Sequence, residues 1–127
     1  MELVAVVIAL ALIEFVVLGM LVGRARGQHG VKAPATTGNE MFERWFRVHY
    51  NTMELLVVFV PATWLFGQYV SPQWAAGLGL VYVVGRIVYV RSYIADPAKR
   101  EFGFGMSVLP ILVMVIGTLL GAGRALM

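Results

Sequence analysis

The chain has 127 residues, of which 60% are hydrophobic and 13% are charged. Soluble domains carry about a quarter charged residues, so this chain has about half the usual charge. A soluble domain of this size leaves about a third of its surface in water, and so apolar a chain could not cover that area with polar side chains. The composition and the mean hydropathy of +0.81 therefore indicate a membrane protein and exclude an ordinary soluble globule.

Cysteine is absent, and there are two histidines, His29 and His49. The lack of cysteine excludes disulfides, thiolate nucleophiles and Cys-based metal sites. Two histidines are too few to indicate a His-rich metal site, so we predict no metal. A net charge of +3 would suggest nucleic acid as the partner of a soluble protein. Since basic residues of membrane proteins mark cytoplasmic loops, we expect membrane lipid and no nucleic acid as a partner.

Two spanning helices are predicted in the N-terminal half, because about 20 residues cross a hydrocarbon core of about 30 Å. The first covers residues 3–23 and contains one charged residue, Glu14. A cleaved signal peptide is the alternative, but the acidic Glu2 and the long apolar run favour a helix. The second covers residues 41–67, and it reaches membrane length only if its polar first half continues into its apolar second half as one helix.

Two more spans are predicted in the C-terminal half. The third, residues 73–95, contains Arg86 and Arg91, and the fourth, residues 97–123, includes Pro110. Lipid-embedded helices tolerate a proline when neighbouring groups satisfy the freed carbonyl. The chain shows no β-barrel alternation. We therefore predict an all-α fold in which residues 1–127 form a single domain, an integral membrane four-helix bundle.

The basic residues of the connections predict the orientation in the membrane. The connection after the first span carries three basic residues, the connection after the third span carries two, and the connection between the second and third spans carries none. The positive-inside rule then places the first and third connections in the cytoplasm and both termini on the opposite side. In a bacterium this would be the cytoplasmic membrane.

Polar side chains form one stripe on each of two predicted helices. At about 100° per residue, the stripe of the second helix falls within about 100° of arc and that of the third within about 60°. Ionisable groups inside a membrane usually face a partner, a cavity or a ligand. The stripes consist of Glu43, Arg44, Arg47, Asn51 and Glu54 on the second helix, and of Tyr82, Arg86, Tyr89 and Tyr93 on the third.

Two interpretations of these stripes are open. In a purely structural one, Glu54 pairs with Arg86 and Arg47 pairs with Glu43. This leaves further arginines near the membrane edge without enough carboxylates, and a small anionic molecule would complete them, because guanidinium grips carboxylates through two hydrogen bonds. His49 lies off the main stripe at the interface, where it could reach the head of a ligand.

The third connection contains a helix-start pattern. Asp96 precedes Pro97, and aspartate is a favoured N-cap while proline is favoured at the first helical position. The fourth helix is therefore expected to begin near Asp96, with Arg100 in its first turns. A helix start has positive potential, and an added guanidinium could lower the pKa of a bound thiol below its ordinary value of about 8.5. A basic cytoplasmic loop with no such role explains the same residues equally well.

The run from Glu43 to Glu54, ERWFRVHYNTME, resembles the E-R-x-x-R-x-x-x-N-x-x-E motif of the MAPEG superfamily, the membrane-associated proteins in eicosanoid and glutathione metabolism. The upstream Thr36-Thr37-Gly38, the later segment 85–93 and the four-span length also fit this family. The family includes glutathione transferases, prostaglandin E and leukotriene C synthases, and a non-enzymatic lipoxygenase-activating binder.

The resemblance implies a homotrimer that binds glutathione between subunits near the cytoplasmic side. To the residues that match the family's glutathione ligands we add His49 from its position on the second helix. The predicted glutathione-binding residues are Arg26, Arg47, His49, Asn51, Glu54, Arg86, Tyr89 and Tyr93.

Arg100 is the predicted catalytic residue. It follows Tyr93 by seven residues, which is the spacing of the thiol-activating arginine in the leukotriene synthase. The prostaglandin synthase has this arginine two positions further on, where Phe102 stands here. Leu55 replaces a tyrosine of the leukotriene enzyme, and Tyr89 replaces a histidine of the prostaglandin enzyme. Neither specialised synthase matches fully, so the resemblance implies a general transferase.

We therefore predict a membrane-bound glutathione S-transferase, or also a glutathione peroxidase, that uses glutathione as a cosubstrate. It would activate the glutathione thiol as a thiolate for attack on a lipophilic electrophile or lipid hydroperoxide that arrives from the bilayer. The alternative is a non-catalytic MAPEG-like scaffold that binds lipid or glutathione. Buried charges also motivate a small transporter, which the motif disfavours.

Overall fold

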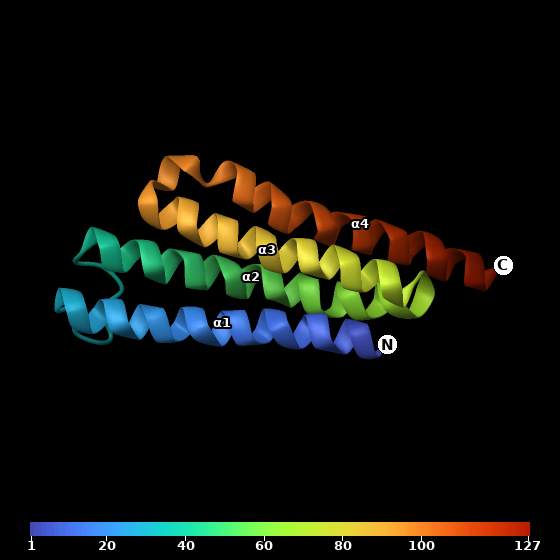
Figure 1. Ribbon diagram of the computed structural model, residues 1–127, viewed down its shortest axis with the longest axis horizontal. Coiled ribbons are helices and arrows are strands. Elements are labelled where there is room, and N and C mark those ends of the chain that lie inside the picture. Colours follow the sequence, from blue (N-terminus) through green and yellow to red (C-terminus); the bar gives the residue numbers. More distant parts are fainter.

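The computed structural model describes all 127 residues as four long helices and one short turn. The helices run up and down side by side (Figure 1). The connections 30–39 and 96–100 lie at one end of the bundle, which we call the basic end, while the turn between the second and third helices lies at the other end with both termini. The elements are α1 (Glu2–His29), α2 (Glu40–Tyr69), α3 (Pro72–Ala95), the 3₁₀ turn η1 (Pro97–Lys99) and α4 (Glu101–Leu126).

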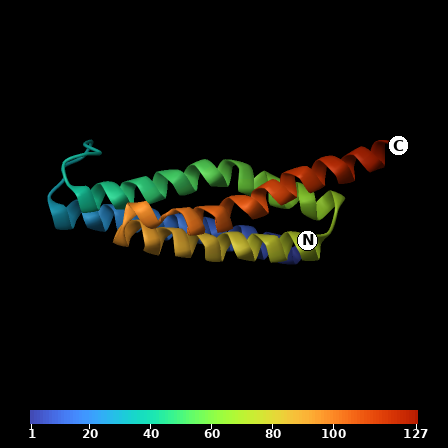
Figure 2. The same ribbon diagram turned by 90° about the horizontal axis from the view of Figure 1, so that it is seen from above.

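The predicted all-α membrane bundle is confirmed. Three of the helices, α1, α3 and α4, are long and apolar enough to cross a membrane. The more polar α2 is one continuous helix of 30 residues, so its polar first half and its apolar second half do belong together. Asn39 caps its start, with the side-chain oxygen accepting from the backbone N–H of Phe42 at 2.9 Å. Figure 2 shows α4 projecting beyond the other helices towards the C-terminus.

The start of α4 differs from the expectation. Asp96 caps the short turn η1, with its carboxylate accepting from the backbone N–H of Ala98 at 3.0 Å. The α-helix begins only at Glu101, and Arg100 is its N-cap residue rather than a member of its first turns. An Asp-Pro pair favours the start of a 3₁₀ turn for the same reasons as the start of an α-helix, so the sequence pattern alone did not separate the two.

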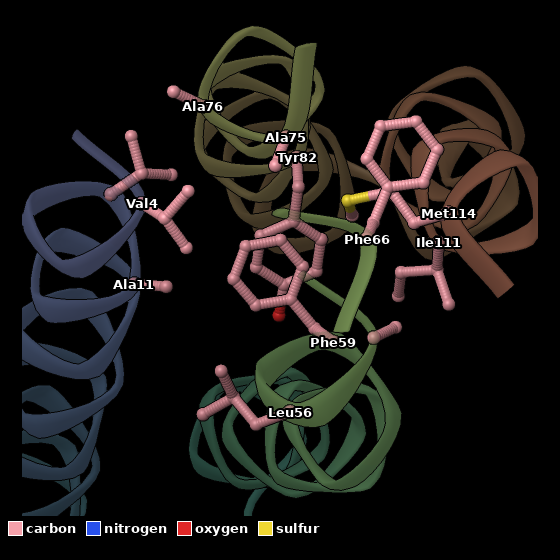
Figure 3. Packing of buried hydrophobic residues seen from close by; sticks show 12 residues of the cluster. Val4, Ala11, Leu56, Phe59, Phe66, Ala75, Ala76, Tyr82, Ile111 and Met114 are labelled. Carbon is pink, nitrogen blue, oxygen red and sulfur yellow. The ribbon is translucent and has the colours of Figure 1, made fainter. Parts of the chain in front are cut away.

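The core lies between all four helices. Phe59 of α2 stacks on Tyr82 of α3, with ring centroids 3.9 Å apart, at the centre of the cluster (Figure 3). Glycines let backbones approach closely, as is common in lipid: a Cβ on Gly103 of α4 would strike the backbone of Tyr89. The outer surface is rich in exposed valine, leucine and isoleucine side chains, which suits contact with lipid. The core cluster includes Val4, Val7, Ala11, Leu56, Phe66, Ala75, Ala76, Ile111 and Met114.

Candidate functional site

The two predicted polar stripes face each other. Arg86 of α3 donates from Nη2 to the side-chain oxygen of Asn51 on α2 at 2.8 Å. Its guanidinium carbon lies 4.2 Å from the ring centroid of Tyr89, and the residue has no exposure to solvent. A guanidinium over an aromatic face is an attractive arrangement, more so away from water. The helix faces predicted for the polar residues of α2 and α3 therefore meet in the structure, although these residues are far apart in the sequence.

A cavity of about 430 Å³ opens beside this contact, towards the basic end. This volume is within the range of about 300–1,000 Å³ typical of small-molecule sites. The cavity is formed by α2, α3 and the start of α4, so that residues from both stripes meet Arg100 there. Its lining residues are Arg47, Asn51, Tyr89, Tyr93, Arg100, Glu101 and Phe104.

The two guanidinium groups of the cavity form no ion pair, although the carboxylate of Glu101 also lines it. Neither Arg47 nor Arg100 has a carboxylate oxygen within 4.0 Å, because the ion pairs of the protein are those of Arg44 with Glu40 and of the N-terminus with Glu2. Arg100 donates only to the carbonyl of Pro97, at 3.0 Å. The two ion pairs that the structural interpretation requires, Glu54 with Arg86 and Arg47 with Glu43, are both absent. The cavity is thus suited to an anion.

Arg44, by contrast, has a structural role, so it does not belong to the arginines left without a partner. Its Nη1 donates to the carbonyls of Ile94 at 2.8 Å and of Ala95 at 3.3 Å. Its Nη2 pairs with Glu40 at 2.6 Å. The two bonds from Nη1 satisfy carbonyls at the C-terminal end of α3, which have no partner within the helix. Arg44 therefore fixes the end of α3 against α2, next to Tyr93.

Four predicted ligands do not line the cavity of the protomer. Arg86 is buried beside it and reaches it only through Asn51. Arg26 donates to the carbonyls of Val31 at 3.4 Å and of Ala35 at 2.8 Å, and so holds the connection 30–39. His49 stacks against Phe15 of α1, with ring centroids 4.5 Å apart. Glu54 is exposed on α2 and makes no hydrogen bond to a side chain or ion pair. The cavity of a single protomer contains Arg47, Asn51, Tyr89, Tyr93 and Arg100 from the predicted set.

Two lining residues, Glu101 and Phe104, were not predicted. Phe104 stands four positions after Arg100, and residues four apart share one helix face. This spacing could have found Phe104 once Arg100 had been chosen. A second hollow of about 460 Å³, which includes Thr36 and Thr37, shares Arg47 and Tyr93 with the cavity and gives room beyond it. No group of three or more acidic or histidine side chains is placed to hold a metal ion.

Comparison with known proteins gives matches over most of the chain. The family model described as MAPEG family matches residues 3–120. An uncharacterized protein of Synechocystis is 48% identical over 116 residues, covering 91% of this chain and 85% of that protein. Human microsomal glutathione S-transferase 2 is 43% identical over 101 residues, covering 80% of this chain and 67% of that enzyme. Leukotriene C4 synthase of Cavia porcellus is 38% identical over 77 residues, covering 61% and 51%. With a family match over nearly its whole length and three apolar helices, the chain belongs to the MAPEG family and is a membrane protein.

Proposed function

We propose that the protein is a membrane-bound glutathione S-transferase that activates the glutathione thiol for attack on lipophilic electrophiles. The observation that supports this most strongly is the cavity in which neither Arg47 nor Arg100 forms an ion pair, and in which these two arginines outnumber the single acid, Glu101. The similarity to a glutathione S-transferase over 80% of the chain supports the same activity. A leukotriene C4 synthase is similar over a smaller part, which favours a general transferase.

The chemistry of glutathione fits the side chains of the cavity. The tripeptide carries two carboxylates, one ammonium group and one thiol. Arg47 would bind a carboxylate through two hydrogen bonds, and Asn51, held by Arg86, would bond the peptide amides. In a homotrimer with glutathione between subunits, Arg26 and Glu54 would contribute from the subunit interface, with Glu54 pairing with the ammonium group. His49 stays a predicted glutathione ligand, and the proposed role of Arg100 does not depend on it.

Arg100 would act on the reacting sulfur. Its guanidinium, with the hydroxyls of Tyr89 and Tyr93, would stabilise the thiolate after the thiol proton has passed to water. The thiolate then forms a C–S bond with the electrophilic carbon, and the leaving group departs with the electrons of its own bond. An apolar groove of about 470 Å³ between α3 and α4 shares Glu101 with the cavity, and a lipophilic electrophile could reach the sulfur from there.

Conjugation of glutathione to a chromogenic aryl halide by the purified protein tests this proposal. We expect Arg100→Ala to lower kcat/KM by about 10- to 100-fold, as removal of a charge-stabilising donor commonly does. The loss should be largest at low pH and smaller at high pH, because without the guanidinium the pKa of the bound thiol rises towards about 8.5. Arg24→Ala is the matched control, since Arg24 is exposed at the same end of the molecule and does not line the cavity.

The conjugation assay, a binding measurement and a hydroperoxide assay together separate the alternative functions. Equal turnover of Arg100→Ala and the unaltered protein at every pH would remove Arg100 from the catalytic role. Binding of glutathione by calorimetry without any turnover would indicate the non-catalytic scaffold. Consumption of an organic hydroperoxide with glutathione would add a peroxidase activity, in which the thiolate attacks the peroxide oxygen and the alcohol departs.

A further inference from the structure

A crevice on the outer face of the bundle, between α1 and α3, has apolar walls and a charged floor. Its volume is about 350 Å³. Ile13 and Val17 of α1 and Ile87 of α3 form part of its walls, and all three are exposed on the apolar outer surface. Glu14 and Arg86 line the same crevice from opposite helices, and the exposed Arg91 lines it one turn further along α3. It has no lining residue in common with the proposed glutathione cavity, which lies towards α4.

The charged groups of the floor are not satisfied within the protein. Arg86 has no exposure to solvent, and its Nη2 is bonded to Asn51, but its Nε and Nη1 are buried without any partner. Oε1 of Glu14 is also buried without a partner. The two side chains form no ion pair within 4.0 Å. Polar groups inside lipid are costly unless they are hydrogen-bonded, so these atoms indicate that another group bonds to them.

The unsatisfied atoms define the chemistry of that group. Arg86 offers N–H donors, whereas a carboxylate on Glu14 offers an acceptor. A hydroxyl group matches both, since it accepts from the guanidinium and donates to the carboxylate. A carboxylate head would be attracted by Arg86 and by Arg91, which also lines the crevice, but would be repelled by Glu14. The apolar walls, which are exposed on the lipid-facing surface, would hold a hydrocarbon chain.

We propose that the α1–α3 crevice is a lipid-binding site, separate from the glutathione cavity, that takes a single-chain lipid with its terminal hydroxyl between Glu14 and Arg86. The combination of a chain-sized apolar cleft with a fully buried, partly unpartnered guanidinium favours such a lipid over a second protein chain. A single water molecule could satisfy the same polar atoms, but it would give the crevice no preference for an alcohol over a hydrocarbon.

Photo-cross-linking of the purified full-length protein in detergent tests the proposal. The probe is a hexadecanol that carries a diazirine on its chain. We expect cross-links in residues 10–18 of α1 and 83–91 of α3. Unlabelled hexadecanol should compete at about tenfold lower concentration than hexadecane, because it adds hydrogen bonds to charged groups.

Substitutions in the crevice give a sharper test. Glu14→Gln removes the repulsion of a carboxylate, so palmitate should gain about tenfold in competition relative to hexadecanol. Val17→Trp should fill the crevice and abolish labelling there. Leu12→Trp is its control, because Leu12 is similarly exposed on α1, at 45% against 46% for Val17, but lines the groove towards α2.

Equal competition by hexadecanol and hexadecane would overturn the proposal, and this comparison needs no substituted protein that might fail to fold. Labelling spread over all exposed helix faces, or labelling of the α1–α3 crevice that persists in Val17→Trp, would overturn it as well. Neither the probe nor the competitors involve glutathione, so the result does not depend on whether the protein proves to be a transferase.

Discussion

Arg86 and Asn51 form the contact on which the geometry of the candidate site depends. Arg86 is fully buried, and its one hydrogen bond, to Asn51, is also the link between α2 and α3 beside the cavity. When a buried charged group loses its hydrogen-bond partner, the protein is strongly destabilised, because the remaining group still bears the free-energy cost of its removal from water. Asn51 is therefore expected to matter for stability as well as for the binding of a ligand.

Asn51→Leu should lower the Tm of the detergent-solubilised protein. Removal of the acceptor leaves a further buried N–H group of Arg86 without a partner, at a cost of about 1–3 kcal/mol. Asn51→Asp, which keeps an acceptor of nearly the same shape, should retain most of the stability. Thermal unfolding followed by circular dichroism measures both variants, and equal Tm values for Asn51→Leu and the unaltered protein would show that this bond contributes nothing.

The arginines also show what sequence reasoning at the residue level can reach. Helix periodicity predicted that the polar stripes of α2 and α3 match, but the suggested partner of Arg86 was Glu54, whereas the structure pairs Arg86 with Asn51. It could not show that Arg44 donates to the carbonyls of Ile94 and Ala95, because the end of α3 comes next to α2 only in the folded chain. In the same way, nothing local predicted the stacking of His49 on Phe15. Side chains that share a helix face can thus have unrelated partners.

At the scale of the helices, α3 and α4 are packed at backbone distance. A Cβ on Gly103 of α4 would strike the backbone of Tyr89, and a Cβ on Gly85 of α3 would lie 2.8 Å from the carbonyl carbon of Met106. Backbone atoms cannot turn aside as a side chain can. Since Tyr89 lines the cavity and Arg100 immediately precedes α4, the fit of these two helices also sets the positions of the proposed catalytic groups.

Gly103→Ala should destabilise the protein by about 1–3 kcal/mol, as overpacking of a close contact does. It should also lower turnover in the conjugation assay, because Tyr89 must shift. Gly77→Ala is the matched control, because nothing lies within 4 Å of its added Cβ. Replacement of this helical glycine by alanine should stabilise the protein by about 0.5–1 kcal/mol. A Gly103→Ala protein as stable and as active as the unaltered one would contradict this account of the packing.

The existence and type of α1, α3 and α4 followed from hydropathy and length, because lipid leaves long apolar helices few alternatives. The helical stripe predicted the polar half of α2, but the continuation of this half into the apolar half remained a condition, which the structure fulfils. The boundary of α4 did not follow from the sequence, since the Asp96-Pro97 pair begins a 3₁₀ turn here. Nor could the sequence show the depth of the cavity, which depends on where η1 places Arg100 relative to Tyr93. Patterns within one helix were readable, and junctions between helices were not.

On the scale of the whole molecule, Glu54 indicates that the protomer does not face lipid on every side. It lies on α2 one turn beyond Asn51, exposed, beside exposed apolar residues such as Val57 and Val58. An exposed carboxylate within a spanning segment is costly unless a cavity or another chain covers it. This position supports the proposed homotrimer, with Glu54 at the subunit interface.

Native mass spectrometry of the protein released from detergent tests the oligomeric state. We expect a species of three times 14.0 kDa. Glu54→Leu should leave the helix content unchanged but remove the ammonium partner of glutathione, so glutathione affinity should fall while the trimer persists. A mass of one copy under conditions where the protein remains folded would argue against the assembly and against a site shared between subunits.

The glycine contacts of α3 have a mechanical consequence. On one side α3 packs closely on α4 at Gly85 and Gly103, and on the other side Gly79 of α3 packs closely on Val7 of α1. The crevice lies further along α1, past that contact. Because α3 and α4 are packed at backbone distance, they cannot move apart readily. A bulkier lipid in the crevice would therefore require movement of the half of α1 that lies beyond Val7. We expect that half of α1 to tilt about its contact at Val7, and the stacked rings of Phe15 and His49 to shift relative to each other.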